Sequence, residues 1–278
     1  PGIYGTELWN GNEFIWANLG RMFTDINDQF LTENLGLDGE GNSLNAITTG
    51  DIEREIFTVD IFQSLTKTLA SSGYQENENL FVFPYDWRLN IDQNTAFLDQ
   101  NIRAVKLITG VSKVDLITNS MGGLLAKDYL NQYGKDDIDK LIFVGTPHLG
   151  APKAAKAILF GDRVNIPWLE DDRIQELAHN SVSAHELLPN RKYFDEFTGY
   201  LKKFSFLQQQ PILDYDQTKD FLLNDKGFNP TVFAKAEEFF NKYLEDYDFV
   251  GVDTYNIAGC RTGTQAGYQL GINNAYVW

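Results

Sequence analysis

The sequence predicts an α/β fold, with a mainly parallel sheet that carries helices on both faces. Two observations lead to this class. Short, continuous apolar segments recur along the chain, as they do in parallel strands that are buried on both sides. Segments with helical periodicity separate them, and strands that alternate with helices are typical of a parallel sheet.

Four apolar segments are the expected strands. They are residues 79–85 (NLFVFPY), 113–118 (KVDLIT), 140–145 (KLIFVG) and 255–259 (YNIAG). Each is short and largely continuous, without a regular alternation of apolar and polar side chains. This pattern fits strands that are covered on both faces.

Two helices are expected between these strands. In residues 94–110 (NTAFLDQNIRAVKLITG) and 122–134 (GGLLAKDYLNQYG), the apolar side chains recur at helical spacing and share one face. Gly110 and Gly134 stand where each pattern stops, and glycine commonly ends a helix.

The order of the elements divides the chain into three parts. Residues 1–150 are the expected first part of the α/β core, with an irregular excursion and a short helix or two at 7–50. Residues 151–250 are predominantly helical in pattern and stand between two strands, so we expect a helical cap over the carboxyl edge of the sheet. Residues 251–278 would supply a late core strand. The large apolar side chains expected in the cap are Phe204, Phe206, Phe239 and Phe240.

Charge and residue types exclude several classes of protein. The formal net charge is −16, and nucleic acid is excluded as a partner because phosphate binding needs clustered Lys and Arg. The single cysteine, Cys260, rules out an internal disulfide. No segment approaches the ~18 apolar residues of a membrane span, and no signal-peptide pattern occurs. We therefore expect a soluble chain; the sequence does not give its compartment, and secretion or a peripheral membrane location are both open.

No cofactor or metal is expected. The three histidines and Cys260 do not have the spacing of zinc ligands. The glycines of the segment GGLL lack the lysine that a phosphate-binding loop requires.

Ser120 is the strongest candidate for chemistry. It stands between an apolar strand pattern and a helical pattern, and Met-Gly-Gly follows it. A nucleophilic serine needs such a sharp turn, flanked by small residues, at the N-terminus of a helix. Thr118 departs from this pattern, because a glycine is usual two residues before the nucleophile. The alternative is that Ser120 is an ordinary N-cap of the helix.

Several segments resemble one known family. They are PGIYGTEL (1–8), FPYDWR (83–88), LITNSMGGLLAKDYL (116–130), VGTPHLGAPKA (144–154) and NSVSAHELLPNRKYF (180–194). Together they resemble the lecithin–cholesterol acyltransferase family, a lipase-like branch of the α/β-hydrolases. The resemblance implies an α/β-hydrolase fold with a helical cap, and it is much less specific for the substrate.

The resemblance also implies roles for single residues. Ser120 would be the nucleophile, and the backbone N–H groups of Ile3 and Met121 would form the oxyanion hole. Tyr4 and His148 would stand in the walls of the site, and the alternative for His148 is that it substitutes for the missing base. The segment YDWR suggests an ion pair between Asp86 and Arg88, which we interpret as structural rather than chemical. His179 and His185 fall in the expected cap, where we expect surface or packing roles.

An acid and a histidine are not found where this fold would place them. In α/β-hydrolases they follow the serine along the chain, after late strands, but residues 254–278 contain no Asp, Glu or His. The segment PGIYG also stands at residue 1, without the strand that normally precedes it. We therefore expect either a piece of a longer protein that supplies these parts or a remnant that keeps the fold without the chemistry.

Two kinds of function follow from these residues. One is a serine esterase, lipase, phospholipase or O-acyltransferase that acts on lipid-like esters through an acyl-enzyme on Ser120. The other is a non-catalytic domain that binds apolar ligands or a partner chain. A thioester or peptide hydrolase that uses the same machinery is a third option. The expected partners are a lipid or other acyl ester and, transiently, a membrane or micelle surface; no oligomeric state can be read from the sequence.

Overall fold

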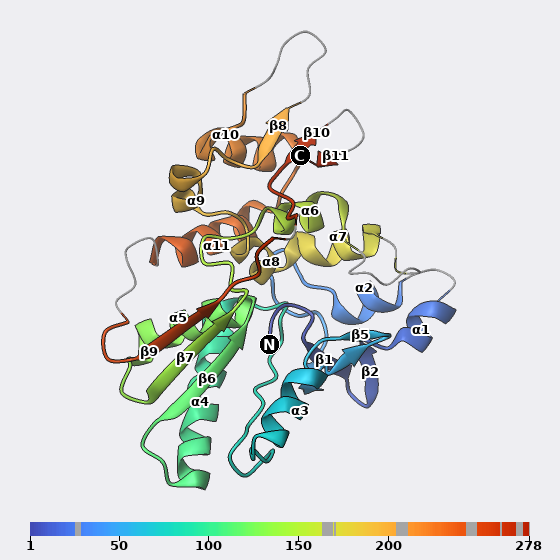
Figure 1. Ribbon diagram of the computed structural model, residues 1–278. Coiled ribbons are helices and arrows are strands. Elements are labelled where there is room, and N and C mark those ends of the chain that lie inside the picture. Colours follow the sequence, from blue (N-terminus) through green and yellow to red (C-terminus); the bar gives the residue numbers. More distant parts are fainter. Residues whose placement is uncertain are drawn as a thin grey trace.

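The computed structural model describes residues 1–25, 29–162, 169, 171–203, 211–242, 249–261, 263–270 and 275–277 (Figure 1). The fold is a mixed α/β arrangement with a parallel sheet, which confirms the predicted class.

The strands are β1 (Thr6–Asn10), β2 (Glu13–Trp16), β3 (Ile47–Ile52), β4 (Glu55–Ile56), β5 (Val59–Asp60), β6 (Val114–Asn119), β7 (Ile138–Val144), β8 (Leu201–Lys203), β9 (Asp253–Ile257), β10 (Tyr268–Leu270) and β11 (Ala275–Val277). The helices are α1 (Leu19–Thr24), α2 (Phe30–Leu35), α3 (Gln63–Ser71), α4 (Ile91–Thr109), α5 (Met121–Tyr133), α6 (Pro152–Phe160), α7 (Asp171–Asn180), α8 (Val182–Glu186), α9 (Arg191–Glu196), α10 (Tyr215–Asp220), the π-helical η1 (Phe221–Asp225) and α11 (Pro230–Lys242).

The central sheet has the order β6-β7-β9, and its strands are all parallel. Three of the four expected strands, at 113–118, 140–145 and 255–259, are therefore confirmed. The two expected helices are present as α4 and α5. Gly110 ends α4 in the left-handed conformation, with φ of 73°, and Gly134 ends α5.

One face of the central sheet is covered and the other is not. Leu116 and the buried Leu141 and Phe143 join the main hydrophobic core together with residues of α4 and α5. On the opposite face, Tyr255 is 52% exposed and Ile257 is 55% exposed. The expectation of helices on both faces is thus wrong for the part of the chain described, because α4 and α5 pack together on one side and the chain after β7 leaves the sheet toward α6 (Figure 1).

The expected strand at residues 79–85 does not form. Only Leu80 makes an isolated bridge, to Glu76, and the following residues run without a partner strand among those described. The backbone N–H of Tyr85 instead donates to the Thr6 hydroxyl at 3.3 Å. An apolar run becomes a strand only where a neighbouring strand offers hydrogen-bond partners.

Residues 7–50 are more regular than expected. The short helices α1 and α2 are present, but β1, β2 and β3 also form an antiparallel sheet of order β2-β1-β3. Gly11 makes the tight turn between β1 and β2 with a positive φ of 57°, a conformation that favours glycine in two-residue hairpins.

The region from 151 to 250 is predominantly helical where the structure describes it. Helices α6 to α11 lie beyond the end of the central sheet from which the chain leaves β9 (Figure 1). They enclose a second hydrophobic cluster, separate from the main core, which includes Ala155, Leu201, Leu222 and Phe233. Phe239 and Phe240 lie in α11, whereas the expected helical residues Phe204 and Phe206 lie outside the described residues.

The segment 251–278 is not purely part of the central sheet. Its strand β9 joins that sheet, but β10 pairs in parallel with β8, through Tyr268 and Leu201, and in antiparallel with β11. The last described residues therefore belong with the helical region.

Candidate active site around Ser120

Ser120 occupies the sharp turn between β6 and α5. Its backbone has φ of 52° and ψ of −123°, a conformation that is costly for a residue with a side chain. The Ser120 N–H donates to the Val144 carbonyl at 2.9 Å, which fixes the turn to the neighbouring strand β7. A serine held in this strained strand-to-helix turn has the backbone geometry of serine-hydrolase nucleophiles.

The N-cap alternative is not supported by the side chain of Ser120. Ser120 stands at the N-cap position of α5, but its hydroxyl makes no capping hydrogen bond to the backbone. By contrast, the side chains of Asn90 and Ser181 cap α4 and α8 by accepting from backbone N–H groups. The hydroxyl of Ser120 is therefore left available for other chemistry.

Thr118 is accommodated although a smaller residue is usual at its position. It is 8% exposed, and its hydroxyl donates to the Ile142 carbonyl of β7 at 3.1 Å. The buried hydroxyl thus has a hydrogen-bond partner on the adjacent strand, so the threonine carries no desolvation penalty there.

Two loops reach Ser120 and its helix because glycines allow close approach. A Cβ atom on Gly2 would lie 2.8 Å from the Ser120 Cβ atom, and one on Gly122 would lie 2.4 Å from the Pro1 carbonyl oxygen. A Cβ atom on Gly123 would lie 2.0 Å from the Thr146 hydroxyl oxygen. The segment 1–5 and the loop after β7 are thus both seated against the start of α5.

The segment 1–5 forms a tight turn beside the serine. Gly5 N–H donates to the Gly2 carbonyl at 3.1 Å, and Tyr4 has a positive φ of 64°, as the third residue of a type II turn does. The Trp16 indole N–H donates to the Tyr4 carbonyl at 2.9 Å. These contacts hold Ile3, which follows Gly2, close to Ser120.

The Tyr4 ring packs among aromatic side chains. Its centroid lies 5.0 Å from that of Trp16 and 4.6 Å from that of Trp87. Burial raises the pKa of the Tyr4 phenol well above its usual range, so the hydroxyl is not a base near neutral pH. The Tyr4 ring is therefore fixed in an aromatic cluster with Trp16 and Trp87.

Two backbone N–H groups beside Ser120 have no hydrogen-bond partner among the described residues. Met121 is the first residue of α5, and the first N–H groups of a helix have no partner within it. Ile3 N–H makes no hydrogen bond within the residues the structure describes. Both groups are candidates to hold a negative oxygen next to Ser120.

His148 lies in the loop between β7 and α6, on the side of β9. Its ring is 4.9 Å from that of Phe143, edge to face, and it hydrogen-bonds the Asn256 side chain. Burial, together with the charge of Lys127, lowers the pKa of His148 to about 4. The neutral ring is held by β7 and β9 and makes no hydrogen bond to Ser120, which fits a wall rather than a base.

The two other histidines are also not partners of Ser120. His179 lies in α7, half-buried. His185 is fully buried in α8, its Nδ1 atom 2.9 Å from the Ser181 carbonyl, where the expected packing role applies. All three histidines of the chain lie in described residues, and no hydrogen bond joins any of them to the Ser120 hydroxyl.

Asp86 and Arg88 form the expected ion pair, which is buried. The Arg88 guanidinium is 1% exposed and donates to both Asp86 carboxylate oxygens, at 2.9 and 2.6 Å. It also donates to the Leu35 carbonyl at 2.7 Å and to the Ser43 hydroxyl at 3.0 Å. All these partners belong to the protein's own framework, so the pair acts as a structural clamp.

The sequence did not indicate how α8 is joined to this clamp. The Ser181 hydroxyl donates to the Arg88 carbonyl at 2.9 Å, and the Ser183 hydroxyl donates to the Trp87 carbonyl. The Glu186 carboxyl accepts from the Ile91 N–H at 2.9 Å, and burial raises the pKa of Glu186 well above its usual range. The only signal in the sequence was polar residues at 181, 183 and 186, which a surface helix would also have.

Asp128 is a buried carboxyl on α5. The Gln132 amide donates to one of its oxygens at 2.7 Å, and the Thr95 hydroxyl also stabilises the charged form. Burial raises the pKa of Asp128 to about 6. The folded protein therefore holds the proton more tightly than the unfolded chain does, and stability is lost as pH rises from about 4 to about 6.

We expect Asp128→Asn to raise the free energy of unfolding at pH 7.5 by about 2–3 kcal/mol, because the uncharged amide carries no cost of burying a charge. Below pH ~4, where the carboxyl is protonated in both states, the gain should vanish. Urea unfolding at several pH values measures this difference. The control is Asp139→Asn at an exposed carboxyl of β7, which should show no such gain; equal stability of Asp128→Asn and the original protein at pH 7.5 would contradict the prediction.

Two kinds of feature are absent from the described part of the chain. Within those residues, no group of three or more His, Cys, Asp or Glu side chains is placed to hold a metal ion. None of the described helices has the length and apolar character needed to cross a bilayer.

Comparison with known proteins adds the following. The model of the lecithin:cholesterol acyltransferase family matches residues 39–267. Phosphatidylcholine-sterol acyltransferase of Mus musculus is 25% identical over 219 residues, which cover 77% of this chain and 48% of that protein. Lysosomal phospholipase A and acyltransferase of Bos taurus is 30% identical over 133 residues, which cover 45% of this chain and 32% of that protein. Phospholipid:diacylglycerol acyltransferase 1 of Arabidopsis thaliana is 26% identical over 227 residues, which cover 64% of this chain and 33% of that protein. The chain thus spans between a third and a half of the length of these relatives.

Proposed function

The chain belongs to the lecithin:cholesterol acyltransferase family, and from this premise we propose that it carries the acyl-enzyme site of a serine-dependent lipid acyl hydrolase or acyltransferase. The three relatives are, by name, a phosphatidylcholine-sterol acyltransferase, a phospholipase A and acyltransferase, and a phospholipid:diacylglycerol acyltransferase. The proposed substrate is accordingly an acyl ester of a phospholipid or a similar lipid. In this proposal the fold is of the α/β-hydrolase type, and residues 151–250 form its cap.

The strained backbone of Ser120 carries this proposal. A φ of 52° at a serine costs free energy, and its hydroxyl makes no capping hydrogen bond that would offset that cost. Gly2, Gly122 and Gly123 let two loops approach at distances that a side chain would block. This combination favours a site built to present a hydroxyl over an ordinary helix start.

In the proposed reaction, the Ser120 oxygen attacks the carbonyl carbon of the ester. The N–H groups of Ile3 and Met121 stabilise the negative charge that develops on the carbonyl oxygen. The bond to the alcohol then breaks, and the alcohol departs with the proton given up by Ser120. The acyl group bound to Ser120 finally passes to water, which gives hydrolysis, or to a second alcohol, which gives transfer.

The proton acceptor for Ser120 is not assigned to a histidine of this chain. His148 is bound to Asn256 and packed on Phe143, and His185 is enclosed in α8. A positioned general base contributes about 10²–10⁴-fold to the rate. Without one, the serine should react slowly even where the oxyanion hole is in place.

A fluorophosphonate probe tests the proposal on the chain as it stands. We expect slow labelling of one serine, with Ser120→Ala removing it completely and Ser72→Ala, at an exposed serine after α3, leaving it unchanged. Mass spectrometry of the labelled peptide identifies the site. His148→Ala should label at the same rate as the original chain.

Three results would contradict parts of the proposal. Labelling that survives Ser120→Ala would show that another group reacts. A large loss of rate in His148→Ala would make His148 the base rather than a wall residue. No labelling of Ser120 after prolonged reaction would favour the alternative, a non-catalytic domain that binds apolar ligands or a partner chain.

A further inference from the structure

Glu53 is a buried residue directly after β3, and it contacts the segment that approaches Ser120. It is 6% exposed. Its backbone N–H donates to the Gly5 carbonyl at 3.0 Å, and Gly5 closes the tight turn of segment 1–5 through its own N–H. Glu53 is thus attached by its backbone to the turn that carries Ile3.

The side chain of Glu53 makes a second connection to the same turn, through the end of β2. One carboxyl oxygen accepts from the Ala17 N–H at 2.8 Å. Ala17 follows Trp16, whose indole N–H donates to the Tyr4 carbonyl at 2.9 Å. A path of contacts therefore runs from the Glu53 carboxyl through Ala17 and Trp16 to Tyr4, the residue after Ile3.

The charge that an ionised Glu53 would carry is not compensated by a cation. Among the described residues, no Lys or Arg side chain forms an ion pair with it, and the guanidinium of the neighbouring Arg54 binds Asp51 and Glu76 instead. The charged groups that face Glu53 are the carboxyls of Glu7 on β1 and Asp51 on β3. Both have the same sign as the Glu53 carboxylate and oppose its ionisation.

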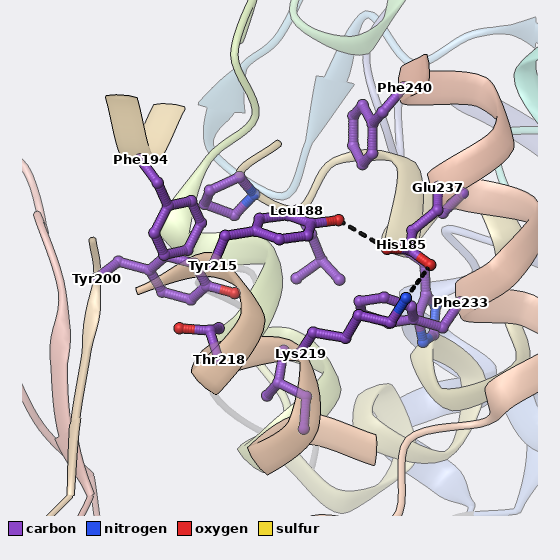
Figure 2. A pocket seen from close by; sticks show the side chains of 13 residues that line it. His185, Leu188, Phe194, Tyr200, Tyr215, Thr218, Lys219, Phe233, Glu237 and Phe240 are labelled. Carbon is purple, nitrogen blue, oxygen red and sulfur yellow. Dashed lines mark hydrogen bonds and ion pairs between the residues drawn. The ribbon is translucent and has the colours of Figure 1, made fainter. Parts of the chain in front are cut away.

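Glu237 in α11 shows the arrangement that Glu53 lacks. The Lys219 ammonium group donates to one oxygen of the Glu237 carboxylate at 2.6 Å, and the Tyr215 hydroxyl donates to the other at 2.9 Å (Figure 2). A cation and a hydroxyl group together compensate that carboxylate. Glu53 has only the Ala17 N–H in the same role among the described residues, so its charged form is poorly stabilised.

The protonation of Glu53 follows from this environment. Burial raises the pKa of Glu53 to about 7; the Ala17 N–H partly offsets this effect, and the charges of Glu7 and Asp51 add to it. Because the pKa is higher in the folded chain than in the unfolded one, the fold favours the protonated form, and this stabilisation is lost as pH rises from about 4.5 to about 7. Above that range the carboxylate is favoured to move toward water, which would loosen the contacts of Ala17 and Trp16.

We propose that the protonated side chain of Glu53 is a positioning residue for the oxyanion hole, because it holds the turn that presents the Ile3 N–H to Ser120. This inference rests on the proposed function, since it takes Ile3 as a donor to the oxyanion. Glu53 acts through Ala17, Trp16 and Tyr4 rather than by contact with the reacting atoms. Its ionisation should slow the reaction of Ser120 while the chain stays folded.

Two substitutions of Glu53 separate the hydrogen bond from the charge. Glutamine has the shape of the protonated carboxyl and keeps an oxygen for the Ala17 N–H at every pH, whereas leucine keeps much of the volume and removes that oxygen. At pH 5.5, Glu53→Gln should react with the fluorophosphonate at Ser120 as fast as the original chain. Glu53→Leu should react at least about tenfold more slowly, because a misplacement of ~1 Å at a site can cost about 10²-fold.

The pH profile separates positioning from a merely structural role. The ratio of the labelling rate of Glu53→Gln to that of the original chain should be close to one at pH 5.5. It should rise to at least about threefold at pH 8.5, where only the original chain carries the charge. Glu55→Gln, at an exposed carboxyl of β4, should give a ratio of one throughout. Circular dichroism at each pH checks that the chains are folded, and in folded chains a change in stability alone leaves the labelling rate unchanged.

Hydrogen exchange tests the positioning without any reaction at Ser120. The Gly5 N–H is bonded within the turn, so in Glu53→Leu it should exchange at least about tenfold faster at pH 5.5 than in the original chain, and in Glu53→Gln at the original rate. The control is the Gly110 N–H at the end of α4, which donates to the Lys106 carbonyl and should keep its rate in both variants.

The outcomes distinguish this inference from the proposed function. If Ser120 of the original chain does not label, the proposed function is wrong and the oxyanion role of the turn is wrong with it. If Ser120 labels, three results overturn the positioning role alone: a folded Glu53→Leu that labels as fast as the original chain, a Glu53→Gln as slow as Glu53→Leu, or a rate ratio that stays at one up to pH 8.5. Should Glu53→Leu fail to fold, the profile of Glu53→Gln still decides.

Discussion

Arg88→Met is expected to lower the free energy of unfolding by about 3–5 kcal/mol, the cost of removing one partner from a buried ion pair. Methionine keeps much of the apolar volume but leaves the Asp86 carboxylate without its guanidinium. It also removes the donors to the Leu35 carbonyl and the Ser43 hydroxyl. Urea unfolding followed by circular dichroism measures the loss.

The matched control for this substitution is Arg54→Met. Arg54 makes an equally forked contact, to Asp51 and Glu76, but its side chain is 29% exposed. Ion pairs near the surface contribute only about 0–1 kcal/mol. If Arg88→Met cost no more than Arg54→Met, the interpretation of Asp86 and Arg88 as a structural clamp would be wrong.

Gly123→Ala should lower the free energy of unfolding by about 3 kcal/mol, because overpacking of this kind typically costs 1–3 kcal/mol or more. The new Cβ atom would lie 2.0 Å from the Thr146 hydroxyl oxygen, so α5 and the loop after β7 must separate. Helix propensity alone predicts a higher free energy of unfolding instead, since alanine is favoured over glycine within a helix by about 1 kcal/mol. Thermal and urea unfolding distinguish the two signs.

A second substitution tests the cause of that loss. Thr146→Ala removes the hydroxyl oxygen and the methyl carbon, the two atoms nearest to the new Cβ atom, but keeps the Thr146 Cβ atom at 2.8 Å, so the double variant should recover part of the stability. Gly20→Ala in α1 is the control, because its Cβ atom would have no neighbour closer than 3.7 Å. A Gly123→Ala variant as stable as Gly20→Ala would show that the loop after β7 can move away from the new Cβ atom at little cost in stability.

The features that could be predicted from the sequence are those that depend on residues adjacent in the sequence. The strand before Ser120 is a short apolar segment and the helix after it has helical periodicity, so their junction could be located within a residue. Gly110 and Gly134 end their helices because each adopts a positive φ, which glycine allows whatever its distant neighbours are. The hairpin of β1 and β2 was also signalled, by Asn10 and Gly11 between apolar residues, but the surrounding Asn- and Gly-rich segment concealed it.

Features that depend on distant partners could not be predicted. Residues 79–85 have a strand composition, yet they form no ladder because strand formation needs a neighbour. The three-residue β8 is too short to show a periodicity, and it pairs with β10, far along the chain. The roles of Ile3, Met121, Tyr4 and His148 came from family resemblance, and they remain proposals that the geometry around Ser120 supports.

The position of α8 has a consequence for how the chain opens. Ser181, Ser183 and Glu186 supply hydrogen-bond partners to backbone groups of residues 87–91, which lie in or beside the main core. Neither segment can detach without leaving buried groups of the other unsatisfied. In hydrogen exchange, the amide of Ile91 and the amides of α8 should therefore exchange through one shared opening event, with the same free energy. A helical region attached only by its connecting loops would instead open on its own, and its amides would exchange before that of Ile91.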